Sequence, residues 1–284
     1  MRIDHISDTA RWVAYYRAVE HDRPDAVFRD PYARRLAGER GAAIASALHR
    51  RSRAMSWIMA VRTVAIDELL VGAVALGATR VVNLAAGMDS RPWRLQLPAS
   101  LRWIDVDLPA ILDEKTETMR DVAPSCRYEA QRVDLTNDAE RQALFSALAS
   151  APAPTVFVTE GLLVYLTPDQ VAALAREIHA VPQANWWLVD SLSPGLLRMM
   201  QRSLARDFGR SVSMHFAPPE GLRFFARYGW KVGQFLSVGA IARRIGRSPS
   251  FFRTVRWMLK MFFMSRRRRA AMRQMIGYAR LDRA

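Results

Sequence analysis

From residue 80 onward, short apolar runs of strand length alternate with amphipathic stretches of helical length. The runs expected as strands are Arg80–Ala85, Arg102–Asp107, Tyr128–Asp134, Thr155–Thr159 and Trp186–Asp190. The stretches expected as helices are Leu108–Arg120, Ala139–Ala149 and Pro168–Ala180. Strands separated by helices pair in parallel through right-handed crossovers, which cover both faces of the sheet. The pattern therefore predicts an α/β protein with a mostly parallel sheet.

The ends of the helical stretches carry local signals as well. Thr167 is expected as an N-cap, with Pro168 in the first helical position and Gln170 three residues after the cap, which is a capping-box arrangement. Residues 1–75 show helical patterns only and precede the first strand. We therefore expect them to form a helical cap over the carboxyl edge of the sheet.

The positive charge of the chain is concentrated near its C-terminus. The whole chain has 42 Lys and Arg, 27 Asp and Glu and a net charge of +15, but residues 198–284 alone hold 20 basic and three acidic residues. Such a region favours nucleic acid, an anionic membrane or an acidic substrate. An arginine-rich composition with only three lysines, and solvated helix faces, explain it equally well. The run Val255–Met264, flanked by basic residues, is either an amphipathic surface segment or a core helix.

Composition and cysteine content exclude several classes of protein. A chain with 50% hydrophobic and 24% charged residues is expected to be globular. A single cysteine, Cys126, forms no internal disulfide, and no Cys/His cluster suggests a metal site, so a reducing cytoplasm is the expected setting. No targeting segment is evident at the start. The longest apolar stretch, Ala54–Ala78, is interrupted by charged residues, so no transmembrane segment is expected.

Small and acidic residues follow the first two expected strands. Gly87 lies in the turn after the first strand and lets a ligand approach the backbone closely, although a tight structural turn explains it as well. Asp107 ends the second strand, at the spacing of a carboxylate that accepts the two hydroxyls of a ribose. A helix N-cap is the alternative role for Asp107.

The next two strand ends continue the pattern. After the third strand, Asp134 is suited to the exocyclic amine of adenine and Leu135 to packing on the ring, although the pair also resembles a helix start. After the fourth strand, Glu160 is suited to bind a cationic group. Ligands of parallel sheets bind beyond the carboxyl ends of the strands, so the four ends together predict a pocket for a positively charged nucleoside. The three spaced glycines of a dinucleotide site are absent.

Three motifs carry a resemblance to a known family. They are Asn83–Arg91, Val106–Pro109 and Thr159–Thr167, with further matches at Phe28–Ala33, Arg62–Asp67, Glu220–Trp230 and Gly277–Leu281. Together they resemble the leucine carboxyl methyltransferase family of class I S-adenosylmethionine-dependent enzymes, which includes polyketide and small-molecule O-methyltransferases. The resemblance implies a Rossmann-like fold with about seven strands. It also implies one methyltransferase domain over residues 1–284, with a cap at 1–75, a cofactor-binding half at 76–190 and a substrate-side, basic part at 191–284.

The resemblance also implies the cofactor, S-adenosyl-L-methionine, and the residues that hold it. Arg62 would bind its carboxylate, Gly87 its methionine moiety and Asp107 its ribose. Asp134 and Leu135 would then hold the adenine, and Glu160 the amino group. This chain departs from many relatives at Ala85, where they have glycine. The extra methyl group is expected to be tolerated if the backbone there avoids a positive φ.

Methyl transfer to oxygen needs mainly an aligned acceptor, and a base only where the acceptor is not already ionised. Tyr165 is a candidate for orienting the acceptor, with helix-face packing as the alternative. His215, after the fifth strand, is a candidate catalytic residue or a structural one. We expect an O-methyltransferase acting on a carboxylate or phenolic hydroxyl of a small, anionic acceptor, with nucleic acid an unlikely partner.

Other classes of function remain open at this point. A nucleic-acid-binding protein or a membrane-surface protein would use the basic C-terminal region. A non-catalytic nucleoside-binding protein would use the strand ends alone. A nicotinamide-dependent reductase would reuse Asp107 but leaves the Glu160 motif unexplained. The sequence leaves the oligomeric state and the acceptor undetermined.

Overall fold

The computed structural model describes residues 6–47, 49–204, 214–247 and 276–284. The strands are β1 (Arg80–Leu84), β2 (Arg102–Asp107), β3 (Arg127–Arg132), β4 (Thr155–Thr159), β5 (Ala184–Leu192), β6 (Trp230–Ser237) and β7 (Ile276–Arg283). The helices are α1 (Ile6–His21), α2 (Ala33–Ala47), α3 (His49–Ala75), α4 (Arg91–Arg94), α5 (Pro109–Met119), α6 (Asp138–Ser150), α7 (Pro168–Ala180), α8 (Pro194–Leu204) and α9 (Val238–Arg244). Two 3-10 helices are η1 (Leu163–Tyr165) and η2 (Gly221–Tyr228).

Within the described residues the strands form one seven-stranded sheet in the order β3-β2-β1-β4-β5-β7-β6. Strands β1 to β5 pair in parallel, whereas β7 lies antiparallel between β5 and β6. The α/β class, the mostly parallel sheet and its seven strands are as expected. The strand order reverses between β1 and β4, and ligands of open α/β sheets bind beyond the carboxyl ends of the strands at such a point.

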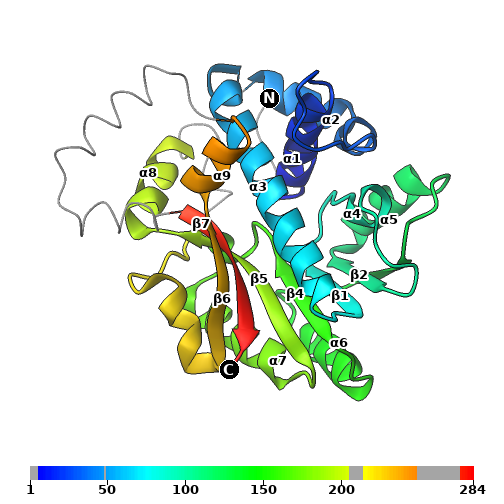
Figure 1. Ribbon diagram of the computed structural model, residues 1–284, viewed down its shortest axis with the longest axis vertical. Helices are drawn as coiled ribbons and strands as arrows, with labels where there is room; N and C mark the ends of the chain where they lie inside the picture. The colour runs from blue at the N-terminus through cyan, green and yellow to red at the C-terminus, as the bar shows by residue number, and fades with distance from the viewer. Residues whose placement is uncertain (1–5, 48, 205–213, 248–275) are drawn as a thin grey trace.

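Two apolar cores lie on the two faces of the sheet, because successive side chains of a buried strand point to opposite faces. Val82, Phe157 and Trp187 face the helices α6 and α7 and the segment η2. On the other face, Val81, Val156 and other strand residues pack against α3 and α9. Figure 1 shows α3 crossing the strands on this second face. Helices therefore cover both faces, as the alternating pattern predicts.

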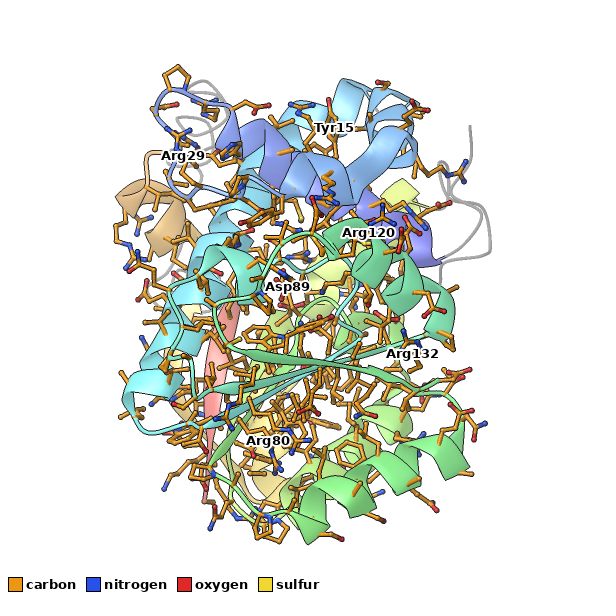
Figure 2. All side chains as sticks on the ribbon, turned by 90° about the vertical axis from the view of Figure 1, so that its right-hand side faces the viewer. Tyr15, Arg29, Arg80, Asp89, Arg120 and Arg132 are labelled. Carbon is orange, nitrogen blue, oxygen red and sulfur yellow. The ribbon has the colours of Figure 1, made fainter. Side chains whose placement is uncertain are left out.

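The N-terminal helices α1 and α2 pack on each other and lie at the end of the molecule opposite to the C-terminus (Figure 1). Asp30, fully buried after α1, accepts hydrogen bonds from Arg17 Nε at 2.8 Å and from Ser90 Oγ at 2.6 Å, in the turn after β1. Figure 2 shows Asp89, in the same turn, between these helices and the strands, and Arg80 at the opposite end of β1. Helices α1 and α2 thus lie over the carboxyl edge of the sheet, and Asp30, in the motif Phe28–Ala33, joins them to it. Helix α3, also expected in the cap, packs instead on one face of the sheet.

At some helix ends the structure agrees with the local signal in the sequence at the same residue. The capping box at α7 is present, because Thr167 Oγ1 accepts from Gln170 N at 3.3 Å while Gln170 Oε1 accepts from Thr167 N at 2.8 Å. Strands β6 and β7 lie outside the alternating pattern that predicts β1 to β5. In β7, Gly277 leaves no room for a side chain, since a Cβ atom there would come within 2.3 Å of Phe235.

Two predictions concern residues that lie wholly or partly outside the described part of the chain. The amphipathic run Val255–Met264 lies wholly outside it, as does most of the basic segment around it. Among the helices that are described, none combines the length and the apolar character needed to cross a membrane.

Candidate active site at the carboxyl ends of β1, β2 and β4

Two residues in the turn after β1 have a positive φ. Ala85 has a φ of 55° and Gly87 a φ of 52°. A side chain at Gly87 would be strained by this φ, and its Cβ would lie 3.0 Å from the Cβ of Ala10 in the cap. The condition under which the Ala85 methyl group was expected to be tolerated, a backbone without a positive φ, is therefore not met. The left-handed conformation that glycine adopts freely is imposed here on alanine, at a cost of about 1–2 kcal/mol.

Asp107 lies beside this turn and joins it to β2. Its Oδ2 accepts a hydrogen bond from Gly87 N at 2.7 Å, and its Oδ1 accepts one from Leu108 N at 2.7 Å. Helix α5 begins after Leu108 with no side-chain capping bond, so Asp107 is not its N-cap. Burial raises the pKa of Asp107. Each carboxylate oxygen accepts more than one hydrogen bond, so Asp107 keeps capacity for ligand hydroxyls.

Asp134 and Leu135 follow β3 next to this position, since Val133 N donates to the Asp107 carbonyl at 3.0 Å. The Oδ1 atom of Asp134 accepts from Thr136 N at 2.8 Å and from Thr136 Oγ1 at 2.7 Å, and these bonds lower the pKa of Asp134. Leu135 is partly buried against the core. Asn137, not Asp134, caps α6. Asp134 therefore shapes a local turn at the strand end that adjoins Asp107.

Glu160 forms ion pairs with two arginines. Arg62 Nε, from α3, lies 2.7 Å from Glu160 Oε1, and Arg91 Nη1, from α4, lies 2.8 Å from Glu160 Oε2. Gly161, with a φ of 71°, allows this approach, since a Cβ there would lie 3.2 Å from Arg62 Nη1. Burial opposes the charge of Arg62, but Glu160 and Asp190 raise its pKa overall. The structure thus brings Arg62 and Glu160, two of the predicted residues, into direct contact.

A network of buried charges, missed by the sequence reasoning, holds Arg91 in place. Asp67 Oδ1 accepts from Arg91 Nε at 2.6 Å, and Asp89 Oδ2 accepts from Arg91 Nη1 at 2.7 Å. Asp67 also binds both terminal nitrogens of Arg94 at 2.7 Å. These contacts join α3 to the turn after β1. Arg91 and Asp67 both lie in the sequence motifs named above, but the pairing of their charges depends on the packing of α3.

Asp190 is a further site residue that the sequence did not single out. It follows Val189, which pairs with Thr159 of β4, so Asp190 lies beside Glu160. Its Oδ2 accepts a hydrogen bond from Gly161 N at 2.5 Å, while its Oδ1 is buried and has no hydrogen-bond partner within the described residues. Burial raises the pKa of Asp190 to about 6, against the opposing effect of Arg62. Its position at the end of an apolar strand was the available sequence signal.

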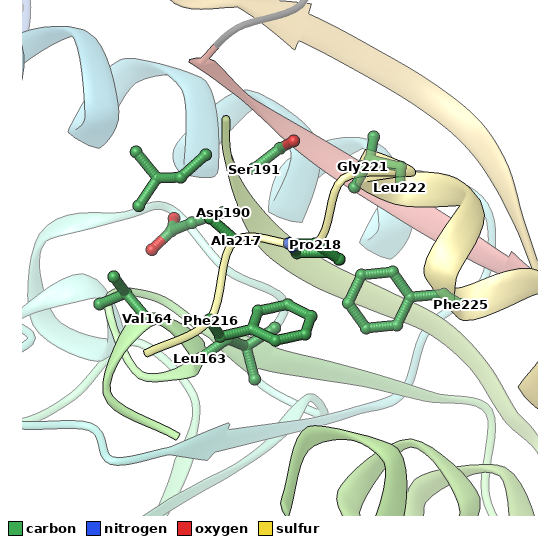
Figure 3. Close-up of a pocket in the computed structure, with 11 residues that line it drawn as sticks. Leu163, Val164, Asp190, Ser191, Phe216, Ala217, Pro218, Gly221, Leu222 and Phe225 are labelled. Carbon is green, nitrogen blue, oxygen red and sulfur yellow. The ribbon is translucent and has the colours of Figure 1, made fainter. Parts of the chain in front are cut away.

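A small cavity adjoins Asp190 (Figure 3). Its lining is almost entirely apolar, and the residues are Leu163, Val164, Asp190, Ser191, Leu192, Phe216, Ala217, Pro218, Gly221, Leu222 and Phe225. They come from η1, β5, η2 and the segment between α8 and η2. Asp190 is the charged residue of this lining.

The two predicted catalytic residues occupy different environments. Tyr165 ends η1 and is partly buried beside α8, and burial raises the pKa of its hydroxyl, with Arg62 and Asp190 near enough to influence it. The side chain of His215 is exposed, although its backbone N donates to Val164 O at 2.7 Å. No contact found in the described part of the chain joins the His215 imidazole to the carboxylates of the site.

The chemistry of this site suits a nucleoside that carries both a carboxylate and an ammonium group. Arg62 on α3 offers a cation and Glu160 after β4 an anion, while Asp107 at the end of β2 offers hydroxyl-accepting oxygens at the same edge of the sheet. No group of His, Cys, Asp and Glu in the described residues could hold a metal ion. Fold and site together show a Rossmann-like protein with carboxylates gathered at the carboxyl edge of its sheet.

Comparison with known proteins places the chain more closely. The family model of leucine carboxyl methyltransferase matches residues 10–179, and the chain belongs to this family. A relative from Streptomyces avermitilis is 34% identical over 232 residues, covering 78% of this chain and 82% of its own length. One from Streptomyces coelicolor is 34% identical over 233 residues, with the same coverage. Both carry the name of an S-adenosyl-L-methionine-dependent methyltransferase.

A solved structure supports the fold. The crystal structure of a DUF574 family protein from Streptomyces avermitilis has a TM-score of 0.58 to this chain and 13% identity, with 97% of each chain covered. At this identity the likeness concerns the fold alone.

Proposed function

We propose that this protein is an O-methyltransferase that transfers a methyl group to a carboxyl or hydroxyl oxygen of a small molecule. It is a methyltransferase of the leucine carboxyl methyltransferase family, and its cofactor is S-adenosyl-L-methionine. The comparisons show the family and the cofactor, and the choice of oxygen as the methyl acceptor is the part that we propose. The observation that carries the proposal is the Arg62–Glu160 ion pair after β4, which shares the carboxyl edge of the sheet with Asp107 at the end of β2.

The ion pair is a preformed partner for the amino-acid end of the cofactor. Arg62 would bind the carboxylate of the cofactor and Glu160 its ammonium group. Each of the two protein charges would then be paired with a charge of the ligand. Arg91 also binds Glu160 at 2.8 Å, and Asp67 and Asp89 hold Arg91 in turn. Because these partners are fixed before a ligand arrives, little side-chain entropy is lost on binding.

Asp107 would accept the ribose hydroxyls, while Gly87 would face the methionine part of the cofactor. Asp134 and Leu135, at the next strand end, would hold the adenine. The bound cofactor supplies an electrophilic methyl group on a sulfonium. The chain has to orient an oxygen toward it and exclude water, and good alignment contributes up to about 7–11 kcal/mol to lowering the barrier.

The division of the chain follows from this assignment. We propose a cap over residues 1–75, a cofactor-binding half over 76–190 and a substrate-side part over 191–284. Tyr165, close to Arg62 and Asp190, is proposed to orient the acceptor. His215 is proposed to contact acceptor groups at the surface, as its exposed side chain allows. The cytoplasmic setting and the anionic acceptor remain predictions.

The test is calorimetric titration of S-adenosyl-L-methionine into the protein and into Asp107→Ala. Binding that is lost in Asp107→Ala, and kept in the exposed control Asp113→Ala, supports the proposal. Transfer of label from methyl-labelled cofactor to an oxygen of a small molecule completes it. No cofactor binding, or equal binding by Asp107→Ala, would refute the assignment of the site.

Steep salt dependence of oligonucleotide binding would instead favour a nucleic-acid-binding protein. Sedimentation with anionic liposomes would favour a membrane-surface protein. No described contact supports either function, because most of the basic segment lies outside the described residues.

A further inference from the structure

Asp190 differs from the other carboxylates around Glu160, because within the described residues it has no ion-pair partner. Its Oδ2 accepts a hydrogen bond from Gly161 N at 2.5 Å, whereas its Oδ1 is buried and has no hydrogen-bond partner there. Glu160, in contrast, pairs with Arg62 at 2.7 Å and with Arg91 at 2.8 Å. Asp190 therefore carries a buried negative charge that no neighbouring cation compensates at close range.

The buried charges around Asp190 leave one negative charge in excess in the described part of the chain. The cations are three arginines and the anions four carboxylates, namely Arg62, Arg91, Arg94, Asp67, Asp89, Glu160 and Asp190. The adjoining pairs Arg17–Asp30 and Lys115–Asp105 are each neutral and do not change this excess. Because a buried charge without a counter-charge is costly, this edge of the sheet favours a ligand with a net positive charge.

The cofactor and the product that it leaves behind differ by one charge. Both have an ammonium and a carboxylate group at the amino-acid end, and these two charges cancel. The sulfonium gives S-adenosyl-L-methionine one further positive charge, whereas S-adenosylhomocysteine, with a neutral sulfur, has no net charge. The excess negative charge at the strand edge therefore complements the cofactor and not the product.

We propose that the charge of Asp190 makes the protein prefer the positively charged cofactor to its neutral product. This inference rests on the proposed function, which places the amino-acid end of the cofactor on Arg62 and Glu160. Two methylene groups separate the sulfonium from that end, and Asp190 lies beside Glu160 because Val189 pairs with Thr159. Two unit charges about 10 Å apart, at an effective dielectric constant of about 20, change an affinity by about tenfold. The preference therefore needs no direct contact between Asp190 and the cofactor.

The protonation of Asp190 makes this preference depend on pH. Burial raises the pKa of Asp190 to about 6, against the opposing effect of Arg62. The other groups that face it are Glu160 after β4, Arg91 from α4, Tyr165 from η1 and Tyr278 from β7. The two arginines and two tyrosines stay protonated between pH 5 and pH 7, because the pKa of each is raised. A nearby positive charge stabilises the Asp190 anion, so binding of the cofactor near pH 6 releases a proton, whereas binding of the product does not.

The variant Asp190→Asn removes the charge and keeps the bond from Gly161 N, because the amide oxygen is still an acceptor. Asp113, exposed and paired with Arg132 at 2.7 Å, gives the matched control Asp113→Asn. Calorimetry without a methyl acceptor measures the binding of S-adenosyl-L-methionine and S-adenosylhomocysteine to the three proteins at pH 5 and pH 7. Sinefungin, in which a carbon atom with an ammonium group replaces the sulfonium, is the second positively charged ligand. The amino-acid ends of all three ligands stay mostly charged in this range of pH.

The preference of the wild type for the two charged ligands over S-adenosylhomocysteine should grow about fivefold from pH 5 to pH 7. In Asp190→Asn the preference at pH 7 should be about tenfold smaller and nearly independent of pH, because the charged ligands bind less tightly while S-adenosylhomocysteine binds as before. Asp113→Asn should behave like the wild type. Titrations of the wild type at pH 6, in two buffers of different ionisation enthalpy, should show about 0.4 of a proton released with S-adenosyl-L-methionine and almost none with S-adenosylhomocysteine.

The same measurements separate failure of this inference from failure of the proposed function. An equal preference in Asp190→Asn and the wild type at pH 7 would overturn the inference and leave the proposed function intact. An equal loss of affinity for all three ligands in Asp190→Asn would also overturn it, since the role of Asp190 would then be structural. If the wild type binds none of the three ligands, the proposed function fails, and the inference fails with it.

Discussion

Replacement of Asp190 by asparagine should stabilise the protein at neutral pH, although it removes a functional group. The pKa of Asp190 is raised from 3.8 to about 6, and burial is the main cause. A difference of about two units between the folded and unfolded protein corresponds to about 3 kcal/mol. Asparagine resembles the neutral carboxyl group in size and keeps the bond from Gly161 N, so it avoids most of this penalty.

The pH dependence distinguishes this effect from a general change in packing. The folded protein binds the Asp190 proton more tightly than the unfolded chain does. The contribution of this group to the free energy of unfolding is therefore lost as the pH rises from about 4 to about 6, and the loss is complete above that range. The advantage of Asp190→Asn over the wild type should be about 3 kcal/mol larger at pH 8 than at pH 4.

Urea unfolding at pH 4, 6 and 8, followed by tryptophan fluorescence, measures this difference. Asp30, Asp67 and Asp89 have lowered pKa values and give the opposite pH dependence, but both proteins share them, so they cancel in the comparison. Asp113→Asn is the control and should follow the wild type. A stability difference that is independent of pH, or larger at pH 4 than at pH 8, would mean that Arg62 stabilises the Asp190 anion and that the reasoning is wrong.

Three further substitutions test other parts of the structure. Lys115→Met should lower the free energy of unfolding in urea by about 3–5 kcal/mol, because it leaves Asp105 as a fully buried charge without its ion-pair partner. The double variant Lys115→Met with Asp105→Asn should recover much of this loss. A much smaller loss in the single variant would contradict the reasoning. Ala85→Gly should raise the free energy of unfolding by up to about 1 kcal/mol by removing the strain of a positive φ, whereas Ala86→Gly should lower it, and the reverse order would refute the strain. Thr167→Ala should lower the melting temperature by removing about 1 kcal/mol of capping, with Thr167→Ser close to the wild type; equal effects of both would argue against the capping bond.

The alternation of strand and helix patterns in the sequence predicted most of the fold. The expected strands at Arg102–Asp107 and Thr155–Thr159 match β2 and β4 in full, and the helix at Pro168–Ala180 matches α7. These signals are local, because the period of apolar residues and the capping residues lie within a few positions of each other. The pattern did not predict strands β6 and β7, because the antiparallel pairing at this edge of the sheet joins segments that are far apart in the chain.

The candidate site divides in the same way. That acidic and small residues follow successive strands was visible in the sequence, and the parallel sheet guarantees that such residues share one edge. Gly87 and Asp107 are joined there by a direct hydrogen bond. The roles of Arg62, Asp134 and Glu160 toward a cofactor stay predictions, as does that of Tyr165.

The sequence by itself determined an α/β chain with a carboxylate-rich strand edge, because strand periodicity and residue chemistry need only neighbours along the chain. The tertiary structure decided which charges neutralise one another and which remain available. Packing of α3 across the sheet brings Arg62 to Glu160, and the β4–β5 pairing brings Asp190 beside both. It also leaves Asp190 Oδ1 buried without a partner. Electrostatic energies depend on distance and burial in three dimensions, and no pattern along the chain encodes them.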